Sequence, residues 1–136
     1  MTRTKLVLVT VTAVAVAAVA AFLTATHTFD AAVMRLKVGR YSEAVGPLEV
    51  LALLGHQQSQ FLMGEANAYG RGVPRNHEAA LKWFRRAAIH SDGLTDPAAY
   101  AAYYVGKSFR DGDAVDKDLG EARFWFEVAQ MGGYRP

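Results

Sequence analysis

An internal repeat with a 42-residue period constrains this chain more than any other feature. Two tryptophan–phenylalanine pairs mark it, Trp83-Phe84 and Trp125-Phe126. Other residues recur at the same offset, namely Gly64 and Gly106, Gly70 and Gly112, Val73 and Val115, Ala80 and Ala122, and Ala87 and Ala129. A fixed period of roughly 20–50 residues is typical of stacked units, none of which can bury its apolar face alone. We therefore predict a repeat architecture.

The first copy of the repeat predicts two helices joined by a turn. Apolar residues recur at helical spacing over residues 57–69 and again over residues 77–90. Between these segments, Gly70 can take the positive φ that ends a helix, and Pro74 cannot sit inside one. Asn76 is well suited to cap the second helix. The pattern indicates helix, turn, helix.

The second copy repeats this logic with different residues. Its first helix is expected to open at Asp96-Pro97, a cap followed by proline at the first helical position. Gly112 provides the break and Asp118 the cap of the second helix. Glu121 stands three residues after that cap, which is the capping-box spacing.

Small and aromatic residues at equivalent positions predict how the helices pack. Gly64 and Gly106 fall inside helices, where glycine costs about 1 kcal/mol relative to alanine. We therefore expect another helix backbone to lie against them, and the Trp-Phe pairs to fill the space between successive hairpins. The alternative is an isolated helical bundle with coincidental glycines. The predicted packing residues are Gly64, Ala80, Trp83, Phe84, Gly106, Ala122, Trp125 and Phe126.

These motifs resemble the Sel1-like repeat, a relative of the tetratricopeptide repeat. The first copy carries Met63-Gly64, Gly70-x-Gly72-Val73, Asn76, Ala79-Ala80, Trp83 and Ala87-Ala88. The second copy carries Val105-Gly106, Phe109, Gly112-x-Ala114-Val115, Asp118, Glu121-Ala122, Trp125 and Ala129. It departs at Ala114, where the family usually has glycine, so a looser turn is expected there. The usual repeat is shorter, and the additional residues lie around 91–97.

A third unit is expected upstream. The segment Gly39-x-Tyr41-x-x-Ala44 resembles the turn and second helix of a tetratricopeptide repeat, and Ala32 would be the small residue of its first helix. Gly46-Pro47 argues against a regular helix, because proline removes a backbone hydrogen bond. That helix is expected either to begin late, near Pro47, or to bend.

The resemblance implies an all-α fold, an α-solenoid of about three helical hairpins preceded by an apolar N-terminal helix. The expected repeat domain covers residues 28–132, with units at 28–55, 57–91 and 97–132, and residues 133–136 form a tail. Three units are about the minimum for a stable stack.

Residues 1–26 are expected to be a signal peptide or a transmembrane anchor. Arg3 and Lys5 precede an apolar run from Leu6 to Leu23 that only two threonines interrupt. Such a run is an export signal or a membrane span. Residues 18–20 offer a small-x-small cleavage site, whereas the length of the run slightly favours an uncleaved anchor through residues 6–25. The basic residues would stay cytoplasmic, so we expect the repeats in the cell envelope, anchored to the inner membrane and facing the periplasm, or exported after cleavage.

No catalytic or metal-binding constellation is visible in the sequence. His77-Glu78 begins like a zinc-protease motif, but Leu81 occupies the position of the second histidine. The acidic residues at 111–118 lack the calcium ligands that an EF-hand-like loop would need at positions 115 and 122. We expect no enzyme activity, cofactor or metal. His56 and His90 are expected near helix C-termini, where a protonated histidine meets the helix dipole favourably.

The charge distribution gives little support to nucleic-acid binding. Without Arg3 and Lys5 the chain has thirteen basic and thirteen acidic residues, and no run of lysine or arginine stands out. Residues 31–90 carry eight basic and four acidic side chains, and residues 91–136 carry five and eight. This separation either orients a partner or reflects ordinary solvated helix faces.

The resemblance also implies a surface for another protein or peptide, because the first helices of such hairpins usually line a concave face. From their spacing around the two glycines, the expected contact residues are Gln58, Phe61, Glu65, Ala68, Tyr100, Tyr103, Lys107 and Arg110. Tyrosine and arginine are enriched at interface hot spots. The alternative is that Tyr100, Tyr103 and Tyr104 pack against the enlarged loop at 91–97.

The expected function is a non-catalytic scaffold or adaptor. Two alternatives stay open: a structural subunit of an envelope complex, docked through the end of the stack, and an inhibitor or immunity-type binder. Some relatives are associated with hydrolase activity, but no paired acid and base residues support it here. The oligomeric state is left open.

Overall fold

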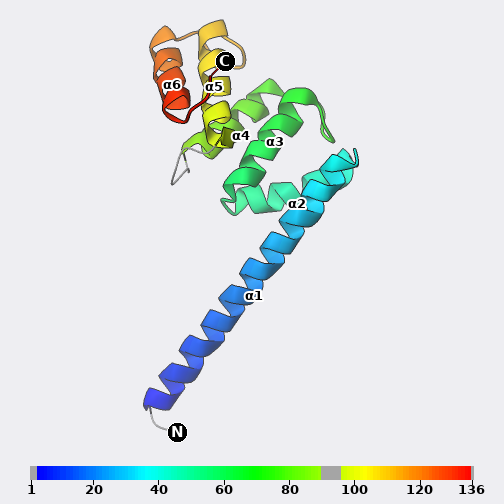
Figure 1. Ribbon diagram of the computed structural model, residues 1–136, viewed down its shortest axis with the longest axis vertical. Helices are drawn as coiled ribbons and strands as arrows, with labels where there is room; N and C mark the ends of the chain where they lie inside the picture. Colours follow the sequence, from blue (N-terminus) through cyan, green and yellow to red (C-terminus); the bar gives the residue numbers. More distant parts are fainter. Residues whose placement is uncertain (1–2, 90–95, 136) are drawn as a thin grey trace.

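In the computed structural model, the described residues, 3–89 and 96–135, form α-helices joined by turns and contain no strand. The order is α1 (Arg3–Lys37), α2 (Tyr41–Leu53), α3 (Gln57–Tyr69), α4 (His77–Ile89), α5 (Asp96–Asp111) and α6 (Leu119–Met131), as Figure 1 shows. The prediction of an all-α fold is therefore confirmed.

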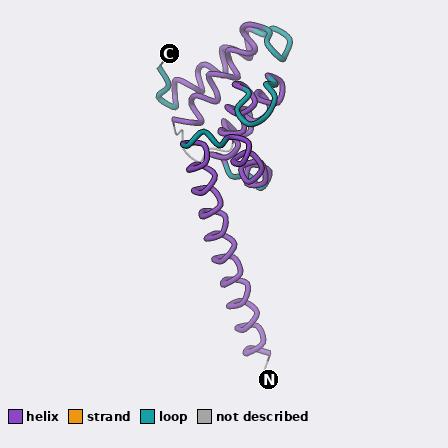
Figure 2. Tube along the Cα trace, turned by 90° about the vertical axis from the view of Figure 1, so that its right-hand side faces the viewer, coloured by secondary structure: helices purple, strands orange, loops and turns teal. Residues whose placement is uncertain are grey.

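The helices stack as hairpins at one end of the long helix α1 (Figure 2). Each helix contacts the next along the chain, and α3 also contacts α5. Two hydrophobic clusters fill the stack. One joins the first hairpin to the second and includes Ala32, Leu48 and Met63. The other joins the second hairpin to the third and includes Phe84 and Trp125.

The two glycines inside helices each lie under an aromatic ring of their own hairpin. A Cβ atom on Gly64 would come within 2.7 Å of the Phe84 ring, and one on Gly106 within 2.8 Å of the Phe126 ring. The expected helix backbone is therefore replaced by a ring at Gly64. At Gly106 the Ala122 carbonyl oxygen is also close, at 3.2 Å.

Each phenylalanine covers the glycine of its own hairpin, and Phe84 also packs on Tyr104 of the third hairpin, in agreement with the prediction that the Trp-Phe pairs lie between hairpins. Phe126 contacts the Tyr103 ring of its own hairpin and no later described hairpin packs on it, contrary to that prediction.

The tryptophans, in contrast, pack toward the preceding hairpin. Trp83 is half-buried against the cluster that joins the first and second hairpins. Trp125 is buried in the cluster that joins the second and third. Ala80 and Ala122 are buried as well. In each repeat, therefore, the tryptophan packs on the preceding hairpin and the phenylalanine that follows it packs on the glycine of its own hairpin.

Side-chain caps begin two of the helices where the sequence predicts them. The Asn76 side-chain oxygen accepts a hydrogen bond from the Ala79 N–H at 3.0 Å. The Asp118 carboxylate accepts from the N–H groups of Gly120 and Glu121. Glu121 does not close the predicted capping box, because the Asp118 N–H donates to the Phe109 carbonyl and the Glu121 carboxylate accepts from the Trp125 indole at 3.2 Å.

His56 lies near the C-terminus of α2, as predicted, and its backbone N–H donates to the Leu51 carbonyl at 2.9 Å. The predicted interaction of its side chain with the dipole of that helix was wrong, because the side chain caps the start of α3 instead. Its Nδ1 accepts a hydrogen bond from the Ser59 N–H at 3.2 Å. Its ring packs on Phe29 with 4.7 Å between centroids, and burial lowers the pKa of the imidazole. His90 lies outside the described residues.

This cap makes one contribution to stability depend on pH. Only a neutral imidazole can accept at Nδ1. Because its folded pKa lies below the unfolded value, the cap contributes fully above about pH 6.5 and is lost as pH falls through the folded pKa. We expect His56→Ala to cost about 1 kcal/mol at pH 8 and clearly less at pH 5. Urea unfolding of both proteins at the two pH values measures this, and a difference that grows on acidification would contradict the cap.

The turn at Ala114 has the same left-handed backbone conformation as its counterpart at Gly72. Ala114 has φ of 66°, in the left-handed region, and Gly72 at the equivalent position has φ of 80°. The second copy therefore keeps the turn and accepts an unfavourable conformation for a residue with a Cβ atom.

Helix α2 begins at Tyr41 and contains Pro47, so of the two expected alternatives the late start near Pro47 was wrong. Pro47 has no N–H to donate to the Glu43 carbonyl. The helix tolerates this loss because Ala44, Leu48 and Leu51 are buried along its length.

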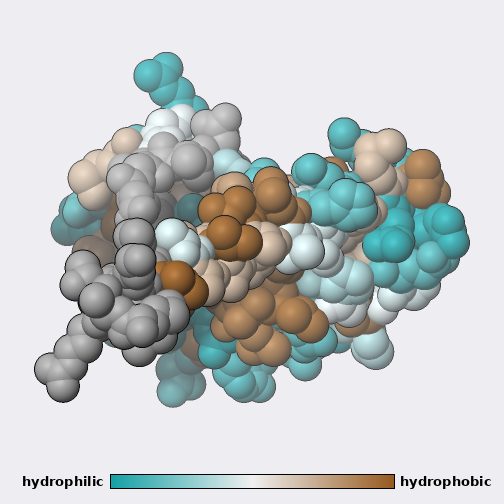
Figure 3. Space-filling view, turned by 90° about the horizontal axis from the view of Figure 1, so that it is seen from below, coloured by the Kyte–Doolittle hydropathy of each residue, from teal (hydrophilic) through white to brown (hydrophobic). Residues whose placement is uncertain are grey.

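Helix α1 is continuous from Arg3 to Lys37 and joins the predicted N-terminal segment to the first hairpin without a break. By length and composition it could cross a membrane over residues Val9–Lys37, and its apolar window is entirely unburied within the chain. From the end at which α1 begins, hydrophobic surface gathers near the middle of the molecule, with hydrophilic surface mostly toward its edges (Figure 3). The exposed apolar side chains of this helix include Val9, Val11, Val14, Val16, Val19, Phe22 and Leu23.

Candidate protein-binding pocket

A tyrosine-lined pocket of about 250 Å³ lies where the second and third hairpins meet. Its walls come from the end of α3, the start of α4, the length of α5 and the turn after it. The lining residues are Ala68, Tyr69, Arg75, His77, Tyr100, Tyr103, Tyr104, Lys107, Ser108, Asp111 and Asp113. We call this hollow the tyrosine pocket.

Hydrogen bonds and ring contacts hold the aromatic wall of the pocket. The hydroxyls of Tyr69 and Tyr100 lie 2.8 Å apart and join α3 to α5. The Tyr100 ring meets the rings of Phe61 and Tyr134, with centroids 5.8 Å apart in each case. Burial raises the pKa of Tyr100, and the hydrogen bond to Tyr69 adds to the effect. The Tyr100 phenol is therefore uncharged at physiological pH.

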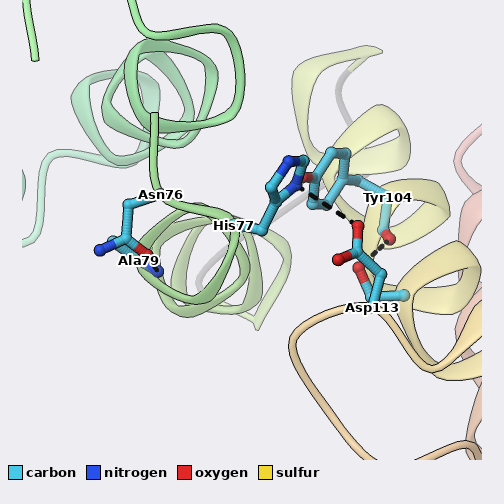
Figure 4. A network of polar contacts seen from close by, with 6 residues as sticks. Asn76, His77, Ala79, Tyr104 and Asp113 are labelled. Carbon is cyan, nitrogen blue, oxygen red and sulfur yellow. Dashed lines mark hydrogen bonds and ion pairs between the residues drawn. The ribbon is translucent and has the colours of Figure 1, made fainter. Parts of the chain in front are cut away.

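His77 links the two hairpins at the polar end of the pocket (Figure 4). Its Nδ1 lies 3.1 Å from the Tyr104 hydroxyl and 3.4 Å from an Asp113 carboxylate oxygen. Burial raises the pKa of Tyr104, and the Asp113 carboxylate raises it further. Tyr104 thus stays protonated and is a poor nucleophile. The contact orders the turn after α5 against α4.

The charged side chains of the pocket are unevenly paired. Asp111 binds Arg110 at 2.7 Å, and Asp113 contacts His77. Arg75 and Lys107 take part in no ion pair within the part of the chain that the structure describes. Two cations at the rim are therefore available to an anionic group of a ligand.

The structure divides the predicted concave-face residues among several places. Tyr100, Tyr103 and Lys107 line the tyrosine pocket together with the buried Ala68. Phe61 packs its ring against Phe84 and belongs to the core as much as to any surface.

The other three predicted contact residues, Glu65, Arg110 and Gln58, do not line the tyrosine pocket. Glu65 lines a separate hollow of about 300 Å³ between the first hairpin and α3, where burial raises the pKa of its carboxyl and Arg71 opposes the rise. Arg110 lies beside the Phe126 ring, at 5.9 Å from its centroid, and lines a surface hollow with α6. Gln58 is exposed.

The pocket also uses residues that the spacing rule passes over. Tyr69, Arg75, His77 and Asp113 lie at or next to turns, whereas the rule counts only first-helix positions.

Tyr134 was placed in the tail but packs on the third hairpin. Its ring lies 4.6 Å from that of Tyr103, and its N–H donates to the Ala129 carbonyl at 3.0 Å. Tyr103 also meets Phe126, at 5.7 Å between centroids. The alternative partner for these tyrosines, the loop around 91–97, lies mostly outside the described residues.

The described residues contain no group of three or more histidine, cysteine, aspartate or glutamate side chains that could hold a metal ion. Three of the four acidic side chains at residues 111–118 have protein partners: Asp111 pairs with Arg110, Asp113 with His77, and Asp118 caps α6.

The Sel1 repeat family model matches residues 57–92 and 99–134, which together make up more than half of the chain. The chain belongs to the Sel1 repeat family. The two matched segments include the second hairpin, most of the third, the residues of the tyrosine pocket and Tyr134. No curated protein matches this chain.

Among solved structures, the chain is similar to a Sel1 repeat protein from Oxalobacter formigenes. The TM-score is 0.67 with 24% sequence identity, and the match covers 78% of this chain. It covers 41% of the other chain, so this protein spans less than half of that relative's length. The similarity shows a shared helical-repeat fold.

Proposed function

We propose that this Sel1 repeat protein is a non-catalytic scaffold or adaptor that binds a protein segment in the tyrosine pocket. Sel1 repeats are protein-interaction modules, which supports a binding role. The observation that carries the proposal is the combination of tyrosine rings with Arg75 and Lys107, which have no ion-pair partner among the described residues. Rigid rings offer contact area with little loss of rotamer entropy.

The chemistry of the pocket defines the ligand that it suits. Tyrosine faces favour an apolar or aromatic side chain, and the two cations favour a carboxylate beside it. A short extended or helical segment with an acidic residue next to a bulky apolar residue would satisfy both. The raised pKa values keep the Tyr100 and Tyr104 phenols neutral, which suits recognition by ring contact and hydrogen bonding.

Residues 6–25 serve, in this proposal, as an uncleaved membrane anchor, with the repeats on the outer side. The continuity of α1 supports this, because cleavage after Ala20 would leave Phe22 and Leu23 exposed at the start of a shortened helix. Arg3 and Lys5 at the other end favour retention of that end in the cytoplasm.

Reversal of one charge at the pocket rim tests the binding role. Lys107 is exposed, so we expect Lys107→Glu to leave the melting temperature unchanged and to weaken partner binding about tenfold, which corresponds to about 1.4 kcal/mol. The measurement is the amount of partner that co-purifies with the full chain from gently solubilised membranes. The matched control is Arg123→Glu, an exposed charge reversal on α6.

The Arg123→Glu control also tests the main alternative, in which the partner docks on the end of the stack and not in the tyrosine pocket. Exposed Leu119 and Phe124 on α6 favour that alternative. If Arg123→Glu abolishes binding and Lys107→Glu does not, the pocket is not the binding site. Light scattering of the full chain in detergent adds a second test, because a monomer at high concentration weakens the idea that this end pairs with another copy.

A further inference from the structure

The hairpin stack has two edges of opposite character. At one edge lie the turns within the hairpins, which carry charged residues. These are Arg40, Arg71, Arg75, Asp111, Asp113, Asp116, Lys117 and Asp118. At the other edge α2, α4 and α6 end; besides exposed polar residues such as Arg86 and Gln130, five large apolar residues are exposed there. They are Val50 (58% exposed), Leu53 (66%), Leu54 (78%), Ile89 (64%) and Met131 (70%). We call these five residues the apolar edge.

The path of the first hairpin places the apolar edge beside the apolar half of α1. The chain leaves the apolar run at Leu23, continues in the same helix to Lys37, and returns in α2. The contact between the Phe29 and His56 rings brings the end of α2 back to the level of Phe29. Phe29 lies six residues beyond Leu23, about 9 Å along a helix. Leu53 and Leu54 immediately precede this contact.

The later hairpins extend the same edge. Figure 1 shows the ends of α2 and α4 on the side of the stack toward the start of α1, whereas the turns within the three hairpins lie farther from the start of α1. A bilayer crossed by α1 would therefore meet the apolar edge and not the charged turns.

We propose that the apolar edge rests in the interfacial layer of the bilayer that α1 spans, as a second membrane contact of the repeat domain. This proposal rests on the proposed anchor role of α1. Apolar side chains gain by entering the boundary between headgroups and acyl chains, where polar neighbours such as His56 can stay hydrated. The bilayer is the surface most suited to cover the apolar edge, because α1 is continuous and keeps this edge next to the membrane in every anchored molecule.

Contact of the apolar edge with the bilayer fixes the orientation of the hairpin stack relative to the membrane. The tyrosine pocket is built largely from residues at or near the charged turns, including Tyr69, Arg75, His77 and Asp113. With the apolar edge on the bilayer, the pocket lies toward the far side of the stack and is open to a partner. The repeats would then lie along the membrane instead of swinging freely on α1.

The chain has no cysteine, which permits a direct test with single introduced cysteines. The full chain is reconstituted in vesicles of phosphatidylethanolamine and phosphatidylglycerol. An environment-sensitive fluorophore is attached at Val16→Cys in α1, at Leu54→Cys or Ile89→Cys in the apolar edge, or at Lys117→Cys in a turn. Lipids with a nitroxide near the top of the acyl chain then quench the fluorophores that enter the membrane.

We expect strong quenching at positions 16, 54 and 89 and at least threefold weaker quenching at 117. Failure of quenching at 16 would refute the membrane anchor itself. Quenching at 16, with positions 54 and 89 no more quenched than 117, would overturn the apolar edge and leave the anchor intact. A second variant tests whether the fluorophore itself, and not the apolar edge, drives insertion into the membrane. With the fluorophore at Ile89→Cys, the double substitution Leu53→Gln and Leu54→Gln should at least halve the quenching. Unchanged quenching at position 89 would contradict the proposal.

Discussion

Replacing Phe84 by alanine is expected to destabilise the repeat domain by about 3–5 kcal/mol, the usual cost of emptying a fully buried aromatic site. Phe84 is completely buried and covers Gly64 within its own hairpin. Its ring also meets Tyr104 at 4.4 Å and Tyr100 at 6.1 Å, so it joins the second hairpin to the third. Because small domains are stable by only about 5–15 kcal/mol, most of the stability would be lost.

The repeat supplies a matched control for this prediction. Phe126 occupies the equivalent position, but it is only half-buried and no further described hairpin packs on it. Phe126→Ala should therefore cost clearly less than Phe84→Ala. Urea unfolding of the full chain in detergent, followed by circular dichroism, measures both. Equal losses would show that Phe84 does not couple the hairpins.

Gly72→Ala is the second substitution with a large expected effect. Gly72 has a positive φ of 80°, and a Cβ atom there would lie 2.6 Å from the backbone of Tyr41. The left-handed conformation costs about 1–2 kcal/mol for alanine, and forcing extra volume against a backbone adds about 1–3 kcal/mol. We expect a total loss of about 2–5 kcal/mol, together with separation of the first hairpin from the second.

The opposite substitution in the second copy serves as its control. Ala114 already adopts a positive φ of 66° and is exposed. Ala114→Gly relieves the left-handed strain but increases the entropy of the unfolded chain, so the net gain should be small, about 0–1 kcal/mol. Midpoints of urea unfolding compare the two variants. A loss at position 72 no larger than the change at position 114 would contradict the close contact with Tyr41.

Sequence reasoning predicts this fold well because the determinants of each hairpin are local. Asn76 and Asp118 act through their own side chains on the next turn of helix, and Gly70 takes the left-handed conformation that ends α3. Burial of the Trp125 ring follows from its place in the repeat. Such features need no knowledge of distant residues.

Errors arise where one side chain has two partners to choose from. Glu121 has the spacing for a capping box, yet its carboxylate accepts from the Trp125 indole. His56 follows one helix and precedes another, and packing on Phe29 selects the second role. Pro47 costs one hydrogen bond, which the burial of neighbouring apolar residues offsets.

The binding site was predicted only in part, because it is assembled from positions far apart in the chain. Helical spacing identifies Tyr100, Tyr103 and Lys107 on α5. It says nothing about Arg75 and His77 on the neighbouring hairpin, whose place depends on how the hairpins stack.

Photo-crosslinking in intact cells tests the central claim most directly. A photo-reactive residue is placed in the full chain at Arg75 or Lys107 in the tyrosine pocket, at Lys82 on α4, or at Arg123 on α6. The account predicts one adduct of the same size from both pocket positions and none of that size from 82 or 123. An adduct formed at 82 or 123 but at neither pocket position would contradict it.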